Sequence, residues 1–577
     1  MRFKHWKIRG FNRSDAIELL DAGIANIPAC ILASRGITDK EQALNFTSDD
    51  LKRCHSPFAM RDMDKAVAAI LSAVKDGEKI AVYGDYDVDG ITATALMYEA
   101  LCEMGADNAV IYIPSREDEG YGLNKQAIDW LAGQGVAFVI TVDCGITGAA
   151  EIAYLYEKGM RAVVTDHHNL PALELVPVCE AVINPKRPDC EYPNKDLAGV
   201  GVAFKLAQAL LASKAGMPVR SVLDRFADLV AMGTIADVMS VIGENRVLIR
   251  RGLQKLREEP RPGIAALIAA CNLAPDMLNT AAIGFTLAPR INAAGRMGQP
   301  MVAARLMLAK NLSEGEEFAG ALIQLNNQRR EIEQVVFDEV VRGLEDKPPR
   351  GPVILSSKSW HQGVSGIVAA KTAEKYLFPT IILCDEENGV SKGSCRSFGN
   401  FKMFSGLAQC GDLLINYGGH DMAAGVTIKT ENIPLLRERL SEIYHKEIQL
   451  PPEPTMIADF IVDKPDKMLT IKNITDIADI EPFGPGNIPP LLAIKEAEML
   501  VCQAIGGGLH TRLVLGAGGT RFNAIFFGIA PDAIGVAVGE KCDIAFEPMI
   551  NEFRGNRSVQ LRLFDVRPSG LGEFENA

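Results

Sequence analysis

The chain has 577 residues, of which 48% are hydrophobic and 23% charged, a composition typical of globular proteins and a length too great for one hydrophobic core. The sequence contains no apolar run long enough to cross a bilayer, and residues 1–9 lack the apolar core of a signal peptide, so we expect a cytoplasmic protein without membrane contacts. The net charge of −13 neither excludes nor indicates a nucleic-acid partner, because binding depends on the local field rather than on the average.

The twelve cysteines are scattered along the chain without a CxxC pair, and several lie inside apolar runs. This distribution is typical of buried thiols in a reducing compartment. It indicates neither disulfides nor a zinc site.

From residue 79 to residue 233, apolar strand-like runs alternate with helical patterns. Such alternation predicts a mainly parallel sheet with helices on both faces, in which functional sites form at the carboxyl ends of the strands. The expected strands cover residues 80–83, 109–113, 137–142, 161–165 and 181–184.

Three further regions follow this α/β pattern. Apolar residues at helical spacing over 301–345 predict long helices that join two globular parts. A proline-rich boundary at 347–352 precedes a second α/β pattern, and another at 451–454 precedes a β-rich tail of about the length of a small barrel. We therefore expect an α/β protein with a helical N-terminal segment (1–50), a parallel-sheet domain (51–300), a helical connector (301–347), a second α/β domain (348–450) and a barrel domain resembling an OB fold (451–577).

Three aspartates at alternate positions, Asp85, Asp87 and Asp89, directly follow the first expected strand. Carboxylates at this spacing repel one another unless a cation lies between them, so the turn predicts a metal site. An EF-hand calcium loop starts in the same way, but its twelfth position needs a bidentate glutamate, where this chain has Leu96. A solvated acidic turn without an ion is the alternative that these residues alone do not exclude.

Companion residues stand at three further element ends: Asp143 after the run 137–142, Asp166-His167-His168 after 161–165, and Asp237 after 233–236. Each of them alone is more typical of a helix cap or a hydrogen-bonded turn. Independent caps do not explain why every one of these ends is acidic. Oxygen ligands with few histidines and no thiolate suit Mg²⁺ or Mn²⁺ better than Zn²⁺.

The acidic turn, the sequence Val-Asp-Cys-Gly-Ile at 142–146 and Asp-His-His at 166–168 resemble the DHH phosphoesterase superfamily. Within it, the chain is similar to the bacterial RecJ exonucleases, which degrade single-stranded DNA from the 5′ end. The resemblance covers nearly the whole chain. Its further motifs stand at residues 119–123, 197–204, 289–296, 360–364, 393–397, 418–425 and 550–557.

This resemblance implies two divalent cations, Mn²⁺ or Mg²⁺, that share Asp143 as a bridging ligand. One ion would also take Asp87, and the other would take Asp89, His167 and Asp237. Two ions arranged in this way lower the pKa of water and stabilise the attacking and leaving oxygens at phosphorus. The implied reaction is phosphodiester hydrolysis.

The resemblance also implies catalytic roles beside Asp143. His168 would face the substrate phosphate as a hydrogen-bond donor, and Asp166 would orient its neighbours. The chain departs from some DHH phosphatases at Tyr83, where they have a histidine ligand. Asp85 or water could supply the ligand missing at the first ion.

Substrate contacts are implied in both α/β domains. A serine hydroxyl beside a guanidinium suits phosphodiester oxygens, and glycines let the backbone approach a nucleotide whose phosphate an imidazole can bond. Surface salt bridges for the arginines and a tight turn for the glycines are the alternatives that the pattern leaves open. The expected substrate-binding residues are Arg116, Arg296, Ser394, Arg396, Gly418, Gly419 and His420.

The tail combines aromatic and basic residues, a combination that suits stacking on unpaired bases and contact with phosphates. Core packing explains the two phenylalanines equally well. The residues concerned are Phe526, Phe527, Arg554, Arg557, Arg562 and Arg567.

We therefore expect a metal-dependent 5′ to 3′ exonuclease that hydrolyses single-stranded DNA to 5′-mononucleotides during recombination and repair. The family's role implies a monomer that receives DNA from a helicase and a single-stranded-DNA-binding protein. One alternative is a phosphodiesterase for short oligonucleotides or cyclic dinucleotides, which would have no use for the β-rich tail. A noncatalytic DNA-binding scaffold is another, although such a scaffold would be expected to lose the carboxylates that this chain keeps.

Overall fold

The computed structural model describes residues 3–116, 119–120, 122–170, 176–345, 347–448, 454–553, 555–571 and 574–577. Three features of the sequence analysis lie outside these residues: Tyr121, residues 451–453 of the second proline-rich boundary, and Arg554. The chain divides into two compact units. The larger comprises residues 52–239 and 251–452, and the smaller comprises 1–51, 240–250 and 453–577.

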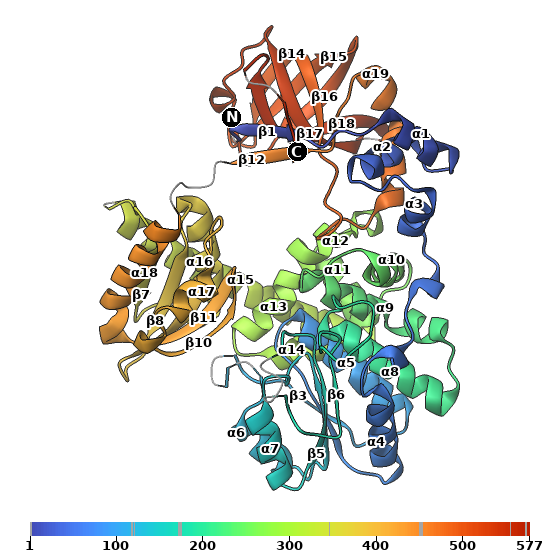
Figure 1. Cartoon of the computed structure of the whole chain (residues 1–577), viewed down its shortest axis with the longest axis vertical. Coiled ribbons are helices and arrows are strands. Elements are labelled where there is room, and N and C mark those ends of the chain that lie inside the picture. Colours follow the sequence, from blue (N-terminus) through green and yellow to red (C-terminus); the bar gives the residue numbers. More distant parts are fainter. Residues whose placement is uncertain are drawn as a thin grey trace. The chain divides into compact units, whose positions relative to one another are not determined.

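The larger unit contains a five-stranded, entirely parallel sheet in the order β3-β2-β4-β5-β6 (Figure 1). Its central strands are buried on both faces, and for this reason they form continuous apolar runs in the sequence instead of an alternating pattern. The five predicted strands are confirmed, with ends that shift by one residue at most. They are β2 (Ile80–Tyr83), β3 (Val110–Tyr112), β4 (Phe138–Val142), β5 (Arg161–Thr165) and β6 (Ala181–Ile183).

Helices cover both faces of this sheet (Figure 1). One face packs against α6 (Lys125–Gly133) and α7 (Ala149–Glu157). The other face packs against α4 (Met63–Lys75), α5 (Val88–Glu103) and α8 (Gly199–Ala215), and α9 (Val219–Ala236) packs in turn on α5 and α8. Because α5 lies between the sheet and two helices, it is buried on nearly every side.

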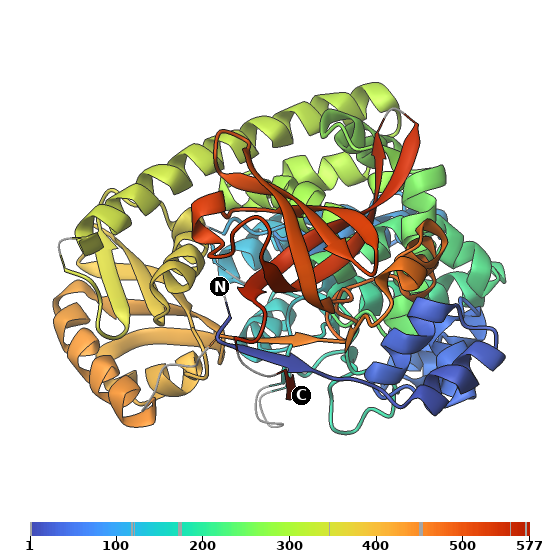
Figure 2. The same cartoon turned by 90° about the horizontal axis from the view of Figure 1, so that it is seen from above.

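A helical region extends this domain towards a second sheet in the same unit. Its α15 (Leu312–Glu345) is a single long helix (Figure 2), which packs against three shorter helices and against α16 (Gln362–Tyr376). The predicted helical connector therefore consists of α14 and α15. The shorter helices are α11 (Pro262–Ala270), α13 (Ala288–Arg296) and α14 (Pro300–Met307).

The second sheet has five strands in the order β10-β11-β9-β8-β7, of which only β7 and β8 run parallel. Helix α16 packs on one face, and α17 (Met403–Ala408) and α18 (Ile433–Glu447) share a core with the other. The strands are β7 (Val353–Ser357), β8 (Thr380–Asp385), β9 (Val390–Arg396), β10 (Leu414–His420) and β11 (Ala423–Lys429).

The smaller unit contains a β-barrel, which closes where β14 pairs with β17. The N-terminal helices α1 (Arg13–Asp21), α2 (Asn26–Ser34) and α3 (Lys40–Thr47) share its hydrophobic core. The barrel strands are β14 (Leu492–Ile505), β15 (His510–Ala517), β16 (Thr520–Phe526), β17 (Lys541–Phe553) and β18 (Asn556–Pro568).

The chain's first strand also belongs to this unit. Strand β1 (His5–Ile8) pairs in parallel with β12 (Thr455–Ala458) and β19 (Glu575–Asn576). The predicted fold class, two α/β domains joined by long helices and followed by a β-barrel, is confirmed. Among the described helices, none combines the length and apolarity that crossing a membrane requires.

Candidate metal centre and substrate pocket

The acidic residues predicted from the sequence gather at the carboxyl edge of the parallel sheet. Strand β2 leads into the turn with Asp85, Asp87 and Asp89, the neighbouring β4 leads into Asp143, and β5 leads into His167. Because neighbouring parallel strands end at the same edge, residues far apart in sequence meet there.

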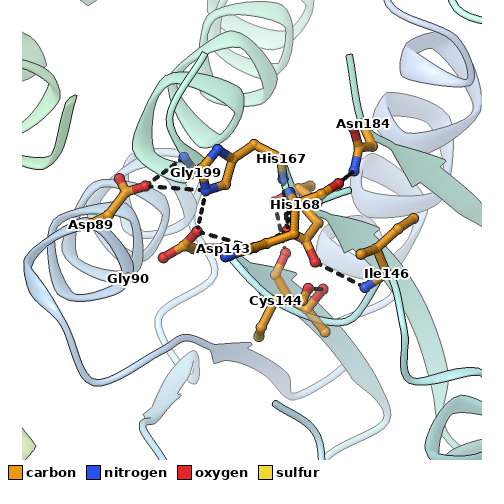
Figure 3. Close-up of polar contacts among 12 residues, drawn as sticks. Asp89, Gly90, Asp143, Cys144, Ile146, His167, His168, Asn184 and Gly199 are labelled. Atoms are coloured by element: carbon orange, nitrogen blue, oxygen red, sulfur yellow. Dashed lines mark hydrogen bonds and ion pairs between the residues drawn. The ribbon is translucent and has the colours of Figure 1, made fainter. Parts of the chain in front are cut away.

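Asp237 reaches the same place from a helix. It caps the carboxyl end of α9, which packs against α5, and its Oδ2 lies 3.4 Å from Nε2 of His167. The imidazole of His167 also points towards Asp143 and Asp89 (Figure 3), with Nε2 3.2 Å from Asp143 Oδ1 and 3.8 Å from Asp89 Oδ2. One helix end and two strand ends therefore converge on a single imidazole, which a third strand supplies.

Potential ligand atoms form three overlapping groups, of which Asp143, His167 and His168 form the one that shares residues with both others. Asp89, His167 and Asp237 each contribute one atom to the first group, in which all atoms lie within 4.8 Å of one another. Asp85, Asp87 and Asp143 form the second group under the same limit. Asp143 joins the two groups through its short distance to His167.

Burial makes these carboxylates costly to ionise. Asp85, Asp89 and Asp143 are each at most 3% exposed, and burial together with their mutual repulsion raises the pKa of all three well above the usual range. Burial and the nearby Asp87 raise the pKa of Asp237 to about 7. A bound divalent cation would remove this repulsion.

The donor set fits such a cation. Among the described residues, no hydrogen-bond partner reaches Oδ1 of Asp85, Oδ2 of Asp237 or Nε2 of His167, although all three atoms are buried. Burial lowers the pKa of His167 to about 3, so its imidazole is neutral and able to act as a ligand. Carboxylate oxygens with one imidazole and no thiolate suit Mg²⁺ or Mn²⁺.

Two helix amino ends hold the acidic turn in place. The carboxylate of Asp89 accepts hydrogen bonds from the backbone N–H groups of Gly199 and Val200 at the start of α8, at 2.6 and 2.8 Å. Asp87 caps α5 by accepting from the N–H of Gly90 at 3.0 Å. These backbone dipoles stabilise negative charge and fix the direction of both carboxylates.

Close backbone packing explains the glycines around the site. A Cβ atom on Gly199 would lie 2.3 Å from Oδ1 of Asp143, and one on Gly90 would lie 2.6 Å from the carbonyl oxygen of Asp85. Asp143 and Val238 also have positive φ values, of 61° and 59°. Such a backbone is rare for residues other than glycine, above all for a β-branched valine, and strain of this kind is concentrated at functional sites.

Asp166 and His168 form a second layer beside the ligand groups. One carboxylate oxygen of Asp166 lies 2.8 Å from Nδ1 of His168 and accepts from the N–H of His167 at 2.7 Å, and the other accepts from the N–H of Ile146 at 2.9 Å. Burial alone would lower the pKa of His168, but the hydrogen bond with Asp166 and the charges of Asp166, Asp237 and Asp89 together raise the pKa to about 9. His168 is therefore a cation at neutral pH.

Arginines line the pocket that opens onto these residues. Its walls include Asp87, Asp237, His168, Arg116 and Arg296. Burial and three neighbouring guanidinium groups lower the pKa of Arg296 to about 10, so it keeps its charge at neutral pH. These three neighbours are Arg116, Arg329 and Arg396.

The second sheet places its predicted residues side by side. Ser394 and Arg396 lie on β9, next to β11, and in register across β11 they face Gly418 and His420 of β10. Gly418 has open space where a side chain would stand, whereas Gly419 has a φ of 136° and the carbonyl oxygen of Ala423 close by. Gly418 therefore leaves an open surface, whereas Gly419 allows a positive φ and close approach to the paired strand β11.

One hydrogen bond joins the two α/β domains at this pocket. Arg296 donates from Nη1 to the carbonyl oxygen of Gly363 at the start of α16, at 3.1 Å. Ser365, in the first turn of α16, lies 3.1 Å from Ser394 Oγ to Oγ. The arginine group and the serine of the second domain thus belong to one continuous site.

Sequence reasoning overlooked several residues of this site. Tyr86 and Asn292 line the pocket, and Asn292 accepts a hydrogen bond from the N–H of Val88 at 3.1 Å. Arg329 on α15 completes the guanidinium group. Tyr86 and Asn292 stand inside motifs that were singled out for other residues, whereas Arg329 lies in a helix whose pattern shows only amphipathic spacing.

The chain matches three family models: the N-terminal domain of the DHH family over residues 79–234, the DHHA1 domain over 350–446 and the RecJ OB domain over 463–565. It is 36% identical to the single-stranded-DNA-specific exonuclease RecJ of Bacillus subtilis strain 168, over 96% of this chain and 69% of that relative. The RecJ of Salmonella typhimurium is 34% identical over 88% of this chain and 90% of its own length. The chain belongs to the RecJ family.

Solved RecJ structures share the whole architecture. The crystal structure of RecJ from Thermus thermophilus in complex with Mn²⁺ has a TM-score of 0.83 and 27% identity, and the match covers 99% of this chain and 80% of that one. The Mg²⁺ complex of the same RecJ has a TM-score of 0.78. The Mn²⁺ and Mg²⁺ that these RecJ structures hold are the two cations that suit the acidic groups described above.

The close packing of Gly199 yields a first prediction. Replacement of Gly199 by alanine forces a methyl group against Asp143 and displaces it, so we expect Gly199→Ala to lower nuclease turnover by about a hundredfold and to weaken Mn²⁺ binding. Gly201→Ala, in the same helix, is the matched control, because the three atoms nearest to its methyl group would all belong to the flexible side chain of Leu197, the nearest at 3.2 Å. Equal activity of the two variants would contradict this role for Gly199.

The raised pKa of Asp237 yields a second prediction, for the metal-free protein. A carboxyl group whose pKa is raised in the folded state stabilises that state below its unfolded pKa, and this contribution is lost as the pH rises through about 7. We expect the melting temperature without metal to fall between pH 5 and pH 7 and to level off above pH 7, and saturating Mn²⁺ to restore about 5 °C or more at pH 7.

Asp237→Asn provides the control for this measurement. The amide does not ionise, so the fall in melting temperature should be smaller and Mn²⁺ should restore less of it. If Mn²⁺ raised the melting temperature of the unaltered protein equally at both pH values, this would contradict the assignment of Asp237 as a metal ligand.

Proposed function

We propose that the chain is a metal-dependent exonuclease that hydrolyses single-stranded DNA from the 5′ end and releases 5′-mononucleotides. The observation that carries this proposal is the intact set of strand-end carboxylates and His167, beside a group of guanidinium cations in the same pocket. Membership of the RecJ family supplies the substrate, since its curated relatives are named single-stranded-DNA-specific exonucleases.

Two groups of residues would hold two divalent ions. We assign Asp89, His167 and Asp237 to one ion, Asp87 to the other and Asp143 to both. The short distances within the second group support the addition of Asp85 as a ligand, a role that the sequence left open. Ions bound there would lower the pKa of water and neutralise charge at the scissile phosphate.

Protein groups would bind and orient the phosphate. His168, held by Asp166 and charged at neutral pH, would donate a hydrogen bond to the charge that develops on the phosphate oxygens. Arg116, Arg296 and Arg396 would bind the terminal phosphate together with Ser394. A terminal phosphate carries more charge than an internal one, so this group of cations favours a chain end.

We retain the five-domain division given above, with residues 51–300 and 348–450 as the catalytic domains and 451–577 as the domain that binds further nucleotides. In the barrel, Phe526 is buried and belongs to the core, whereas Phe527 is 50% exposed and is the aromatic residue available for stacking. Arg562 forms an ion pair with Glu547.

One predicted phosphate contact in the tail is wrong. The guanidinium of Arg567 is buried between the rings of Trp6 and Phe574, with Cζ 4.5 Å from each ring centroid, and it lies 3.4 Å from Asp543. This arginine packs the barrel against the N-terminal strand. It is therefore not exposed to DNA.

The two alternative functions have less support. A phosphodiesterase for dinucleotides would not need the barrel, which matches the RecJ OB domain model. A noncatalytic scaffold would not need the carboxylates, and the described site keeps them all in two compact groups.

The biological setting that we propose follows the family. The protein would act as a monomer in the cytoplasm, in recombination and repair, on DNA delivered by a helicase and a single-stranded-DNA-binding protein. All twelve cysteines are free thiols, as suits a reducing compartment.

The proposed polarity predicts how end-blocked substrates behave. With Mn²⁺ present, we expect labelled single-stranded DNA blocked at its 3′ end to be degraded to mononucleotides. The same strand blocked at its 5′ end should resist, because its terminal phosphate cannot enter the arginine group. Product length measured on denaturing gels checks this expectation.

Duplex and dinucleotide substrates complete this experiment. We expect blunt duplex DNA to resist, since the pocket has to receive an unpaired end. Cleavage from the 3′ end or in the middle of the strand would contradict the proposal. Turnover of dinucleotides alone would favour the phosphodiesterase alternative.

A further inference from the structure

The short segment Ser115-Arg116 is held in place by one carboxylate. Glu119 accepts hydrogen bonds from the backbone N–H of Ser115 at 2.8 Å, from the hydroxyl of Tyr112 at 2.8 Å and from the side-chain amide of Asn124 at 2.9 Å. Its own N–H donates to the carbonyl oxygen of Ser115 at 2.9 Å. Two described residues on either side of Arg116 in the sequence, Ser115 and Asn124, are thereby joined through one side chain.

Further contacts tie this network to the central sheet. Asn124 also donates to the hydroxyl of Tyr83, at 3.3 Å, and that hydroxyl donates to the carbonyl oxygen of Gly122 at 3.0 Å. The rings of Tyr83 and Tyr112 stack, with their centroids 5.2 Å apart. Tyr83, at which the chain departs from some DHH phosphatases, therefore joins Gly122 and Asn124 to the central sheet.

Arg116 needs such an anchor because it lies among other cations. Its guanidinium lies over the ring of Tyr86, 5.4 Å from the centroid, and forms part of the pocket wall. Arg296 and Arg396 are close enough for Arg116 to depress the pKa of both. Like charges at this range repel, so without a fixed backbone the side chain would turn away towards solvent.

We propose that Glu119 is a positioning residue for substrate binding, which acts by holding the segment that presents Arg116 to the terminal phosphate. This inference rests on the proposed function, because Arg116 meets a phosphate only when the 5′ end of a strand lies in the pocket. Glu119 touches neither the ligand groups nor the substrate. Its effect therefore has to pass through Arg116.

A double-mutant cycle tests this inference on the full-length protein with Mn²⁺ and 5′-phosphorylated single-stranded DNA. Glu119→Gln puts an amide donor opposite the donors of the network, so we expect KM to rise about tenfold or more while kcat changes less. In an Arg116→Ala background, the same substitution should add little. Additive effects, or a fall in kcat at unchanged KM, would overturn the proposal.

Three controls separate positioning from a general loss of structure. Glu119→Gln should leave Mn²⁺ affinity unchanged, since no ligand group is touched, and a large loss of that affinity would contradict the proposal.

Tyr112→Phe removes one hydrogen bond to the same carboxylate, and we expect a smaller rise in KM even if Glu119→Gln folds poorly. An unchanged KM for Tyr112→Phe would count against the network.

The matched control is Asp129→Asn, which perturbs another carboxylate that accepts from a tyrosine hydroxyl, Tyr154, at 2.9 Å in the same domain. Its KM should equal that of the unaltered protein, and a rise equal to that of Glu119→Gln would overturn the proposal. Failure of the unaltered protein to degrade DNA would instead refute the proposed function, so the two failures are distinguishable.

Discussion

Mutual repulsion among buried carboxylates is the constraint on which the rest of this site depends. The sheet delivers Asp89 and Asp143 to a place with almost no solvent, where neither is stable as an anion without a counter-charge. The surrounding structure stabilises these carboxylates in several ways. Two helix amino ends donate to the carboxylates, glycines let the backbone approach closely, and a neutral His167 offers a lone pair. Divalent cations would supply the remaining charge.

The pocket contains two regions of opposite charge, one of carboxylates and one of guanidinium groups. The acidic groups lie at the end of the parallel sheet, whereas the guanidinium group comes from the segment after β3, from α13, from α15 and from β9 of the second sheet. Phosphodiester hydrolysis needs both regions. The guanidinium cations bind the phosphate oxygens, and the divalent ions held by the carboxylates would act at phosphorus. The bond from Arg296 to Gly363 links the two α/β domains at the place where these regions meet.

The sequence predicted the parts of this site that depend on strand ends. Asp143 and His167 each follow a continuous apolar run, and in a parallel sheet such ends share one edge. Contacts that depend on the pairing of distant segments could not be predicted from the sequence. Strand β1 pairs with strands more than 400 residues away, and the N-terminal helices complete the core of the barrel. The burial of Arg567 follows from that pairing, so a local run of basic residues gave the wrong expectation for it.

We propose above all that two ions share Asp143. Mn²⁺ stoichiometry, measured by titration calorimetry alongside DNA hydrolysis, tests it most directly, with the exposed Asp189→Ala as the control. We expect two Mn²⁺ per chain in the unaltered protein and in the control. Asp143→Ala should bind fewer ions and lose hydrolysis while it keeps much of its DNA affinity. A single Mn²⁺ in the unaltered protein, or full turnover by Asp143→Ala with Mn²⁺, would contradict the claim.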